Sequence, residues 1–111
     1  MDIPQVISKD ASTIGSMGQH YLVCGKDIAL RRWEQGVCEY SRETTRDYET
    51  VGYVLSGVIE LDLDGQPVKL RAGDSWLVPQ GAAHRYRVLE PMIAIEATSP
   101  PARFNQRDEP A

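Results

Sequence analysis

One segment constrains the fold more than any other, because it combines strand alternation with a tight turn. In Val58–Leu63 apolar and acidic side chains alternate, so one face of the strand is apolar and the other faces water. Asp64 and Gly65 follow, a dipeptide that tolerates the positive φ values of a two-residue turn. The alternation resumes in Val68–Arg71, and the whole pattern predicts an antiparallel β-hairpin.

Short β segments separated by turn signals continue on both sides of this hairpin. The further predicted strands are Ile28–Glu34, Val37–Arg42, Val51–Leu55, Ser75–Val78, His84–Leu89 and Met92–Ala97. Turn signals around Gly73 and Gly81 recur at the spacing of an all-β sandwich or barrel. Because no helical periodicity of convincing length interrupts them, the sequence predicts an all-β fold.

The length of the chain and the positions of its strand-breaking residues predict a single domain. A chain of 111 residues is too short for two independent cores. We expect residues 1–27 to form a loose arm with room for one short strand near Tyr21–Val23, and residues 28–99 to form the barrel. Pro100 and Pro101 cannot extend a ladder, so residues 100–111 are expected to leave the barrel as a polar, partly mobile tail.

Charge and cysteine content narrow the choice of partners and compartment. The 16 acidic and 12 basic side chains leave a formal charge of −4, which does not attract phosphate backbones, so no nucleic-acid partner is expected. Cys24 and Cys38 are too few for a disulfide-held secreted scaffold, which favours a reducing cytoplasm. No long apolar run or signal peptide is visible, so we expect a soluble, cytoplasmic protein with no membrane partner.

Two stretches resemble the conserved motifs of the cupin family. Gly73–His84 is similar to the second motif, with a glycine, five residues, a Pro-x-Gly and a histidine three positions on. Tyr53–Gly57 is similar to the end of the first motif, and the 15 residues between Gly57 and Gly73 suit the short spacer of the family. The resemblance implies an antiparallel double-stranded β-helix, the RmlC-like jelly-roll barrel, as a single domain.

The resemblance also shows where the usual metal ligands of cupins have been replaced. The common first motif supplies two histidines and a glutamate, and counting back from Gly57 places Thr44, Arg46 and Thr50 at those positions. Only His84 stands at its expected place. A threonine hydroxyl is a poor ligand and a guanidinium repels a cation, so no metal is expected at the standard site.

A shifted metal site remains open as an alternative. His84, Glu49 and His20 together would offer ligands acceptable to Zn, Fe or Mn. Glu49 lies one residue from the expected acidic position, and neighbouring strand residues point to opposite faces. This alternative therefore requires a bulge that turns Glu49 inward.

Alternation suggests which side chains face the inside of the barrel. If His84 points inward, Tyr86 does so as well. An inward Arg46 would be paired with an internal acid or reserved for an anionic group of a ligand. We predict that Thr44, Arg46, Thr50, His84 and Tyr86 face a ligand. The alternatives are that Arg46 pairs with a nearby acid or lies outside, and that His84 is a core histidine.

The predicted function is the binding of a small polar or anionic metabolite, such as a sugar or an organic acid, without the standard metal. The alternative is a metal-dependent cupin enzyme, a dioxygenase, isomerase or lyase, that uses His84 and non-standard ligands. A metal-free enzyme is a third reading, since some cupin relatives resemble sugar epimerases that use His and Tyr as acid and base. A homodimer is expected in each case, because barrel edges and apolar outer faces are commonly covered by a second subunit.

Overall fold

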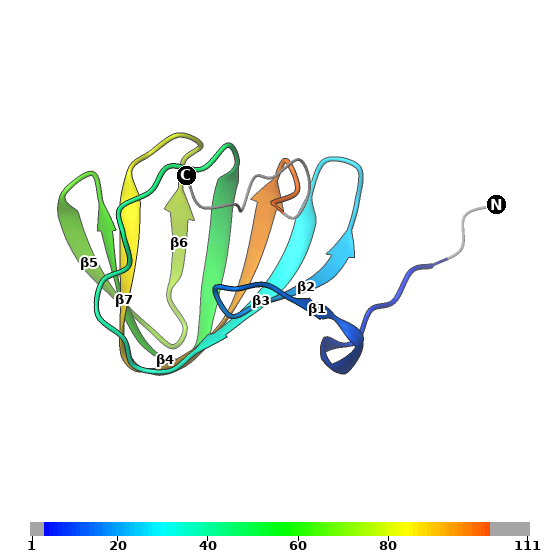
Figure 1. Ribbon diagram of the computed structural model, residues 1–111, viewed down its shortest axis with the longest axis horizontal. Helices are drawn as coiled ribbons and strands as arrows, with labels where there is room; N and C mark the ends of the chain where they lie inside the picture. The colour runs from blue at the N-terminus through cyan, green and yellow to red at the C-terminus, as the bar shows by residue number, and fades with distance from the viewer. Residues whose placement is uncertain (1–3, 103–111) are drawn as a thin grey trace.

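Two long strands, β4 (Glu49–Leu63) and β7 (His84–Ser99), organise the molecule. The computed structural model describes residues 4–102 (Figure 1). β4 and β7 pair antiparallel along their whole length, and their register shifts between Val54 and Ile59. Gly57 lies in this region with a φ of 85°, and a Cβ there would meet the Pro91 carbonyl oxygen at 2.2 Å. The pair bends here because only glycine fits this backbone.

The bend places the halves of β4 and β7 in two different sheets, as the yellow and orange parts of β7 show (Figure 1). The first half of β4 pairs with β6 (Ser75–Val78), and the second half of β7 pairs with β3 (Ala29–Gln35). The second half of β4 pairs instead with β5 (Gln66–Arg71). Antiparallel strands that bend from one sheet into the other form a jelly roll, so the predicted all-β fold is confirmed.

The hairpin and most of the other predicted strands are present. Asp64 and Gly65 both have positive φ, 51° and 81°, as the two-residue turn between β4 and β5 requires. Strands β3, β5 and β6 lie where they are predicted, with small shifts of their ends. The predicted segments Val51–Leu55 and Val58–Leu63 are joined in β4, and a single β7 likewise replaces His84–Leu89 and Met92–Ala97.

The predicted strand Val37–Arg42 is wrong. The backbone N–H groups of Cys38, Ser41 and Thr44 bond to the carbonyls of Val88, Tyr86 and His84. Three residues on this side therefore match every two residues on β7, which prevents a regular ladder. The segment still follows the first half of β7 closely, through isolated bridges at Cys38 and Thr44.

The N-terminal region contributes more than a loose arm. A short 3-10 helix, η1 (Lys9–Ala11), precedes β1 (Thr13–Ile14) and β2 (Gln19–Cys24). β2 pairs with β3 and includes the strand predicted near Tyr21–Val23, and β1 pairs with β2 at the edge of the sheet. At the other end the backbone N–H of Ala102 donates to Thr98 Oγ1, so the chain stays packed just past the prolines. The rest of the predicted tail, 103–111, lies outside the described residues.

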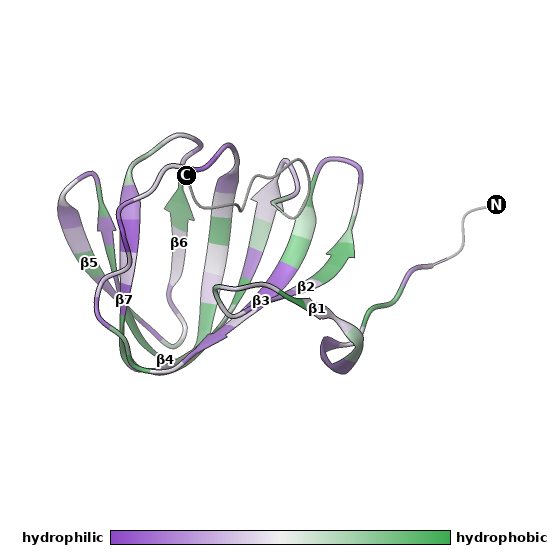
Figure 2. Cartoon of the chain, in the orientation of Figure 1, coloured by the Kyte–Doolittle hydropathy of each residue, from purple (hydrophilic) through white to green (hydrophobic). Residues whose placement is uncertain are grey.

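The core lies between the two sheets, and hydrophobic and hydrophilic bands alternate along the strands that enclose it (Figure 2). Its fully buried members are aliphatic residues of β4 and β7, namely Val54, Ile59, Leu61 and Val88 with Ala94. Alternate residues of the same strands that are polar therefore point either outward or into a cavity. Between Pro4 and Ala102 there is no helix long and apolar enough to cross a membrane.

Candidate functional site

Inward-pointing side chains at one end of the core enclose a cavity of about 220 Å³. Its floor consists of buried residues from β2, β3, β7 and the chain just before β4: Gln19, Arg31, Trp33, Tyr48 and Glu96. Its mouth consists of less buried residues: Met17, Ser41, Arg42, Thr44 and Arg46. His84 and Tyr86, at the start of β7, complete the lining between floor and mouth.

The floor holds a buried ion pair. Arg31 and Glu96 are cross-strand neighbours on β3 and β7, and Arg31 Nε donates to Glu96 Oε1 at 2.8 Å. Only 10 % of the Arg31 side chain and 3 % of the Glu96 side chain are exposed. Tyr48 adds to the pair, because its hydroxyl lies 3.5 Å from Arg31 Nη1 and its ring faces the guanidinium. Each charge thus has an opposite charge beside it, as burial at this depth demands.

A second arrangement fixes the side chain of Tyr86. Trp76 Nε1 donates to the Tyr86 hydroxyl at 3.1 Å, and the Trp33 ring packs edge-on against the Tyr86 ring, with centroids 4.9 Å apart. The indole of Trp76 lies over Gly52, the residue opposite it on β4. Burial, followed by the negative charge of Glu96, raises the pKa of Tyr86 well above its ordinary value. Tyr86 is therefore neutral at physiological pH and can donate its hydroxyl proton.

His84 is oriented by the backbone. Its Nδ1 lies 2.9 Å from the Ala82 carbonyl oxygen. A carbonyl oxygen can only accept a hydrogen bond, so Nδ1 carries the hydrogen and Nε2 of the neutral ring carries a lone pair. Thr44 lies directly across from His84, since the two residues exchange backbone hydrogen bonds of 2.9 Å in both directions.

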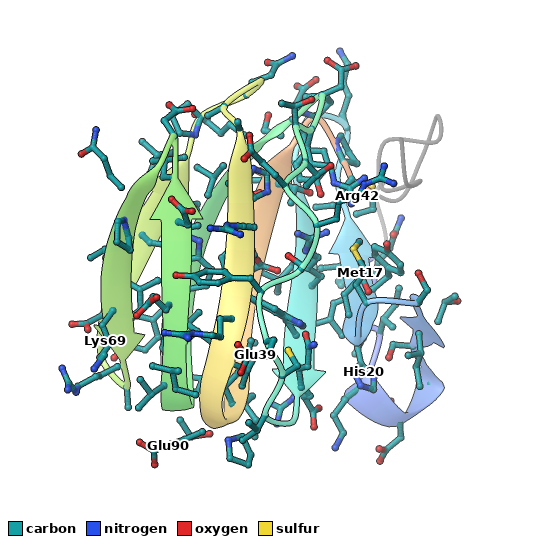
Figure 3. The ribbon with its side chains drawn as sticks, turned by 60° about the vertical axis from the view of Figure 1, so that its left-hand side comes forward. Met17, His20, Glu39, Arg42, Lys69 and Glu90 are labelled. Atoms are coloured by element: carbon teal, nitrogen blue, oxygen red, sulfur yellow. The ribbon has the colours of Figure 1, made fainter. Side chains whose placement is uncertain are left out.

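Two arginines approach the mouth from the segment beside β7. Arg42 and Arg46 stand two residues before and after Thr44, and all three line the cavity together with His84. Arg46 Nη2 lies 3.5 Å from Met17 Sδ, in the loop between β1 and β2. Arg42 and Met17 lie close to each other on the side of the barrel where this loop meets the segment (Figure 3). The mouth therefore combines positive charge with one apolar side chain.

Four of the five predicted ligand-facing residues line this cavity together: Thr44, Arg46, His84 and Tyr86. Thr50 is buried between Val78 and Thr98 on neighbouring strands, outside the lining. Their role in binding stays a prediction. The floor residues Arg31 and Glu96 were not predicted from the sequence. They are in direct contact, but they are 65 positions apart in the chain. Alternation in β3 could have placed Arg31 inward, but its partner depends on strand pairing.

The structure does not assemble the shifted metal site. His20 contacts Ser12 through Nδ1 at 3.2 Å and faces Glu34 at 3.7 Å through Nε2. Glu49 is exposed at the start of β4, opposite Ser99. Within residues 4–102 there is no group of three or more His, Cys, Asp or Glu side chains that could hold a metal ion.

The residues at the usual ligand positions of cupins do not fit a transition metal either. The cavity there presents one imidazole, from His84, beside the hydroxyl of Thr44 and the guanidinium of Arg46. Zinc and similar ions require three or four nitrogen, sulfur or carboxylate ligands, and a permanent cation at the site opposes their binding.

The structure is similar to several solved cupins at low sequence identity. An RmlC-like cupin from Shewanella frigidimarina is 20 % identical with a TM-score of 0.75, over 88 % of this chain and 92 % of that one. KdgF from Halomonas sp. is 20 % identical with a TM-score of 0.75, over 89 % and 94 %. EutQ from Clostridium difficile is 21 % identical with a TM-score of 0.69, over 78 % and 66 %. At these identities the similarity shows the fold.

Sequence comparison identifies the family. Among proteins of curated function, none matches this chain significantly. The cupin domain pattern, in contrast, matches residues 33–98. This range extends from β3 to β7 and contains most of the cavity lining. Since the match covers more than half of the chain, this protein belongs to the cupin family.

Proposed function

We propose that this cupin binds a small organic anion in its cavity, without a metal ion. The observation that carries the proposal is the excess of positive charge on the lining. Glu96 is the one carboxylate among the lining residues, and it is already bonded to Arg31. Arg42 and Arg46 add two further guanidinium groups at the mouth. Guanidinium groups bind carboxylate and phosphate oxygens through paired, charge-assisted hydrogen bonds.

The remaining lining supports a small ligand. A cavity of about 220 Å³ lies below the usual range of drug-sized sites, so it suits a metabolite of a few carbon atoms. Trp33 and Met17 offer apolar contact, while Thr44 and Tyr86 offer hydroxyl groups. The mixture of apolar and polar walls is typical of pockets in which a few polar groups set the orientation of the ligand.

The test compares anionic and neutral probes of similar size. We expect succinate and malate, but not glucose or glycerol, to raise the melting temperature of the protein at constant ionic strength. Arg46→Gln should weaken the affinity for the anions by about 10- to 100-fold, because a charge-assisted hydrogen bond is lost. Isothermal titration calorimetry measures the affinities.

The matched control removes the same charge elsewhere. Arg71 is exposed at the end of β5 and does not line the cavity, so Arg71→Gln should leave the affinity unchanged. Stabilisation by the neutral sugar alone, or equal anion affinities in the Arg46→Gln variant and the wild type, would contradict the proposed function.

A further inference from the structure

The lining of the mouth combines hydrogen-bond donors with one acceptor placed among them. The guanidinium groups of Arg42 and Arg46 can only donate, and the hydroxyl of Tyr86 accepts from Trp76 and so directs its own proton elsewhere. Nε2 of neutral His84 can only accept, because Nδ1 holds the hydrogen. No hydrogen bond from another described residue reaches His84 Nε2. A ligand that pairs with all of these groups therefore needs an anionic group for the arginines and a hydrogen-bond donor for His84 Nε2.

Strand geometry limits how far apart these two groups of the ligand can be. Thr44 and His84 form a hydrogen-bonded antiparallel pair, for which the Cα atoms lie about 5.5 Å apart. Arg42 and Arg46 stand two residues to either side of Thr44, and both line the cavity together with His84. Their guanidinium groups can therefore hold an anion next to the imidazole. A donor within one or two bonds of the anionic carbon then reaches His84.

We propose that the ligand is a hydroxycarboxylic acid whose hydroxyl group is on the carbon next to the carboxylate or one carbon further. The carboxylate binds Arg42 and Arg46, and the hydroxyl donates to His84 Nε2. The hydroxyl oxygen accepts from Tyr86, which stays protonated. This assignment rests on the proposed function, since it specifies the anion that the cavity binds.

The experiment uses pairs of acids that differ by one hydroxyl group, at pH 8, where an ordinary imidazole is neutral. The pairs are malate against succinate and lactate against propionate, with both enantiomers of each hydroxy acid. Calorimetry should show that one enantiomer of each hydroxy acid binds roughly 5- to 50-fold more tightly than its unsubstituted partner, because an unused acceptor in the site is costly.

Variants of His84 separate the role of the acceptor from the integrity of the barrel. His84→Leu should lose most of the preference for the hydroxy acid, because only the hydrogen bond from Tyr86 then remains, and His84→Gln, which restores an acceptor, should recover part of it. Circular dichroism and the melting temperature check that each variant is folded. A preference that is undiminished in His84→Leu would overturn the assignment.

The outcomes distinguish failure of this inference from failure of the proposed function. If wild-type protein binds malate and succinate equally and Arg46→Gln loses both, the cavity binds anions but the hydroxyl assignment is wrong. If neither acid binds wild-type protein, the proposed function itself is wrong. If the hydroxy acids bind wild-type protein more tightly and most of this preference is lost in His84→Leu, the result supports both the proposed function and the hydroxyl assignment.

Discussion

Residue 52 is a glycine, and the missing side chain leaves room for the Trp76 indole beside the cavity. A Cβ on Gly52 would lie 2.3–2.7 Å from three atoms of the Trp76 indole. The indole passes over Gly52 and reaches Tyr86 with its N–H group, which positions the tyrosine at the wall of the cavity. Trp76 is itself buried, so the ring has little room to shift.

We expect Gly52→Ala to destabilise the protein by about 1–3 kcal/mol, because the new methyl group overlaps the buried indole. Urea denaturation measures the free energy of unfolding. The double variant Gly52→Ala with Trp76→Leu should be less destabilised than the sum of the two single changes, since the leucine vacates the space. Additive effects would show that the overlap with Trp76 is not the cause.

The same substitution, Glu to Gln, should change the free energy of unfolding very differently in a buried ion pair and in an exposed one. Glu96→Gln removes the carboxylate that is bonded to the buried guanidinium of Arg31, and should cost about 3–5 kcal/mol in unfolding free energy. Glu39 lies 3.9 Å from Arg87 with 91 % of its side chain exposed, so Glu39→Gln should change the stability by less than about 0.5 kcal/mol. Equal effects in urea denaturation would contradict this account.

The outer faces of β4 and β7 are charged along one half of each strand and apolar along the other half. In the sheet that contains β5, Glu60 and Asp62 on β4 pair with Arg87 and Arg85 on β7. Tyr40 covers this network, because both guanidinium groups stack on its ring and its hydroxyl donates to Glu60. The sequence predicted a solvated hairpin here, but Asp62 is buried. The charged residues at alternate positions of these two strands are therefore linked to one another on the outer face of the sheet.

The network predicts a defined pH dependence of stability. The hydrogen bond from Tyr40, followed by the charge of Arg87, lowers the pKa of Glu60 from its ordinary 4.5, so this stabilisation is present above pH 4.5 and lost as the pH falls. The same hydrogen bond, followed by burial, raises the pKa of Tyr40 from 10.0, so the stabilisation is present below pH 10 and lost above it.

We expect the Tyr40→Phe variant to lose less stability than the wild type when the pH is taken below about 4.5 or above about 10. Thermal unfolding of both proteins across this range measures the difference. Tyr53→Phe is the matched control, because the exposed Tyr53 lies on the other half of β4 and should leave the pH profile unchanged. Parallel profiles for wild type and Tyr40→Phe would contradict this reading.

At the scale of the whole molecule, the outer face of the other sheet is apolar. One row across four strands consists of Leu30, Ala97, Val51 and Leu77, and the next row brings Ile95 beside Tyr53. Val51, Tyr53, Leu55 and Leu77 are each 45–49 % exposed. A contiguous exposed apolar patch of this kind is uncommon on monomers and is typical of an interaction surface, on which each partner of a stable complex buries about 800 Å².

We expect a second copy of the chain to cover this face. The centre of the patch carries no charge, so two copies can meet face to face about a twofold axis without repulsion, and the flanking side chains and loops supply the remaining area. Tyr53→Glu should convert a dimer into a monomer in analytical ultracentrifugation. Val68→Glu, on the equally exposed β5, is the control and should stay dimeric. A wild-type protein that is monomeric at high concentration would contradict this expectation.

Much of the fold could be predicted from the sequence because its signals are local. Alternation and the Asp64-Gly65 turn predicted the hairpin, and the motif around Gly73–His84 predicted the cupin fold. The same motif placed His84, and counting from Gly57 placed Thr44 and Arg46 on the cavity. The joining of short segments into long bent strands could not be predicted, since a bulge leaves no gap in the apolar pattern.

The sequence by itself determined most of the strand positions and the turns, because side-chain periodicity and glycine conformations depend on neighbouring residues. Only the tertiary structure decided which polar groups meet in the cavity. Arg31 and Glu96 lie on strands 65 residues apart, and their contact depends on the register between β3 and β7. Shifting that register by one residue would turn both side chains to the opposite face, so no local pattern could reveal the pair.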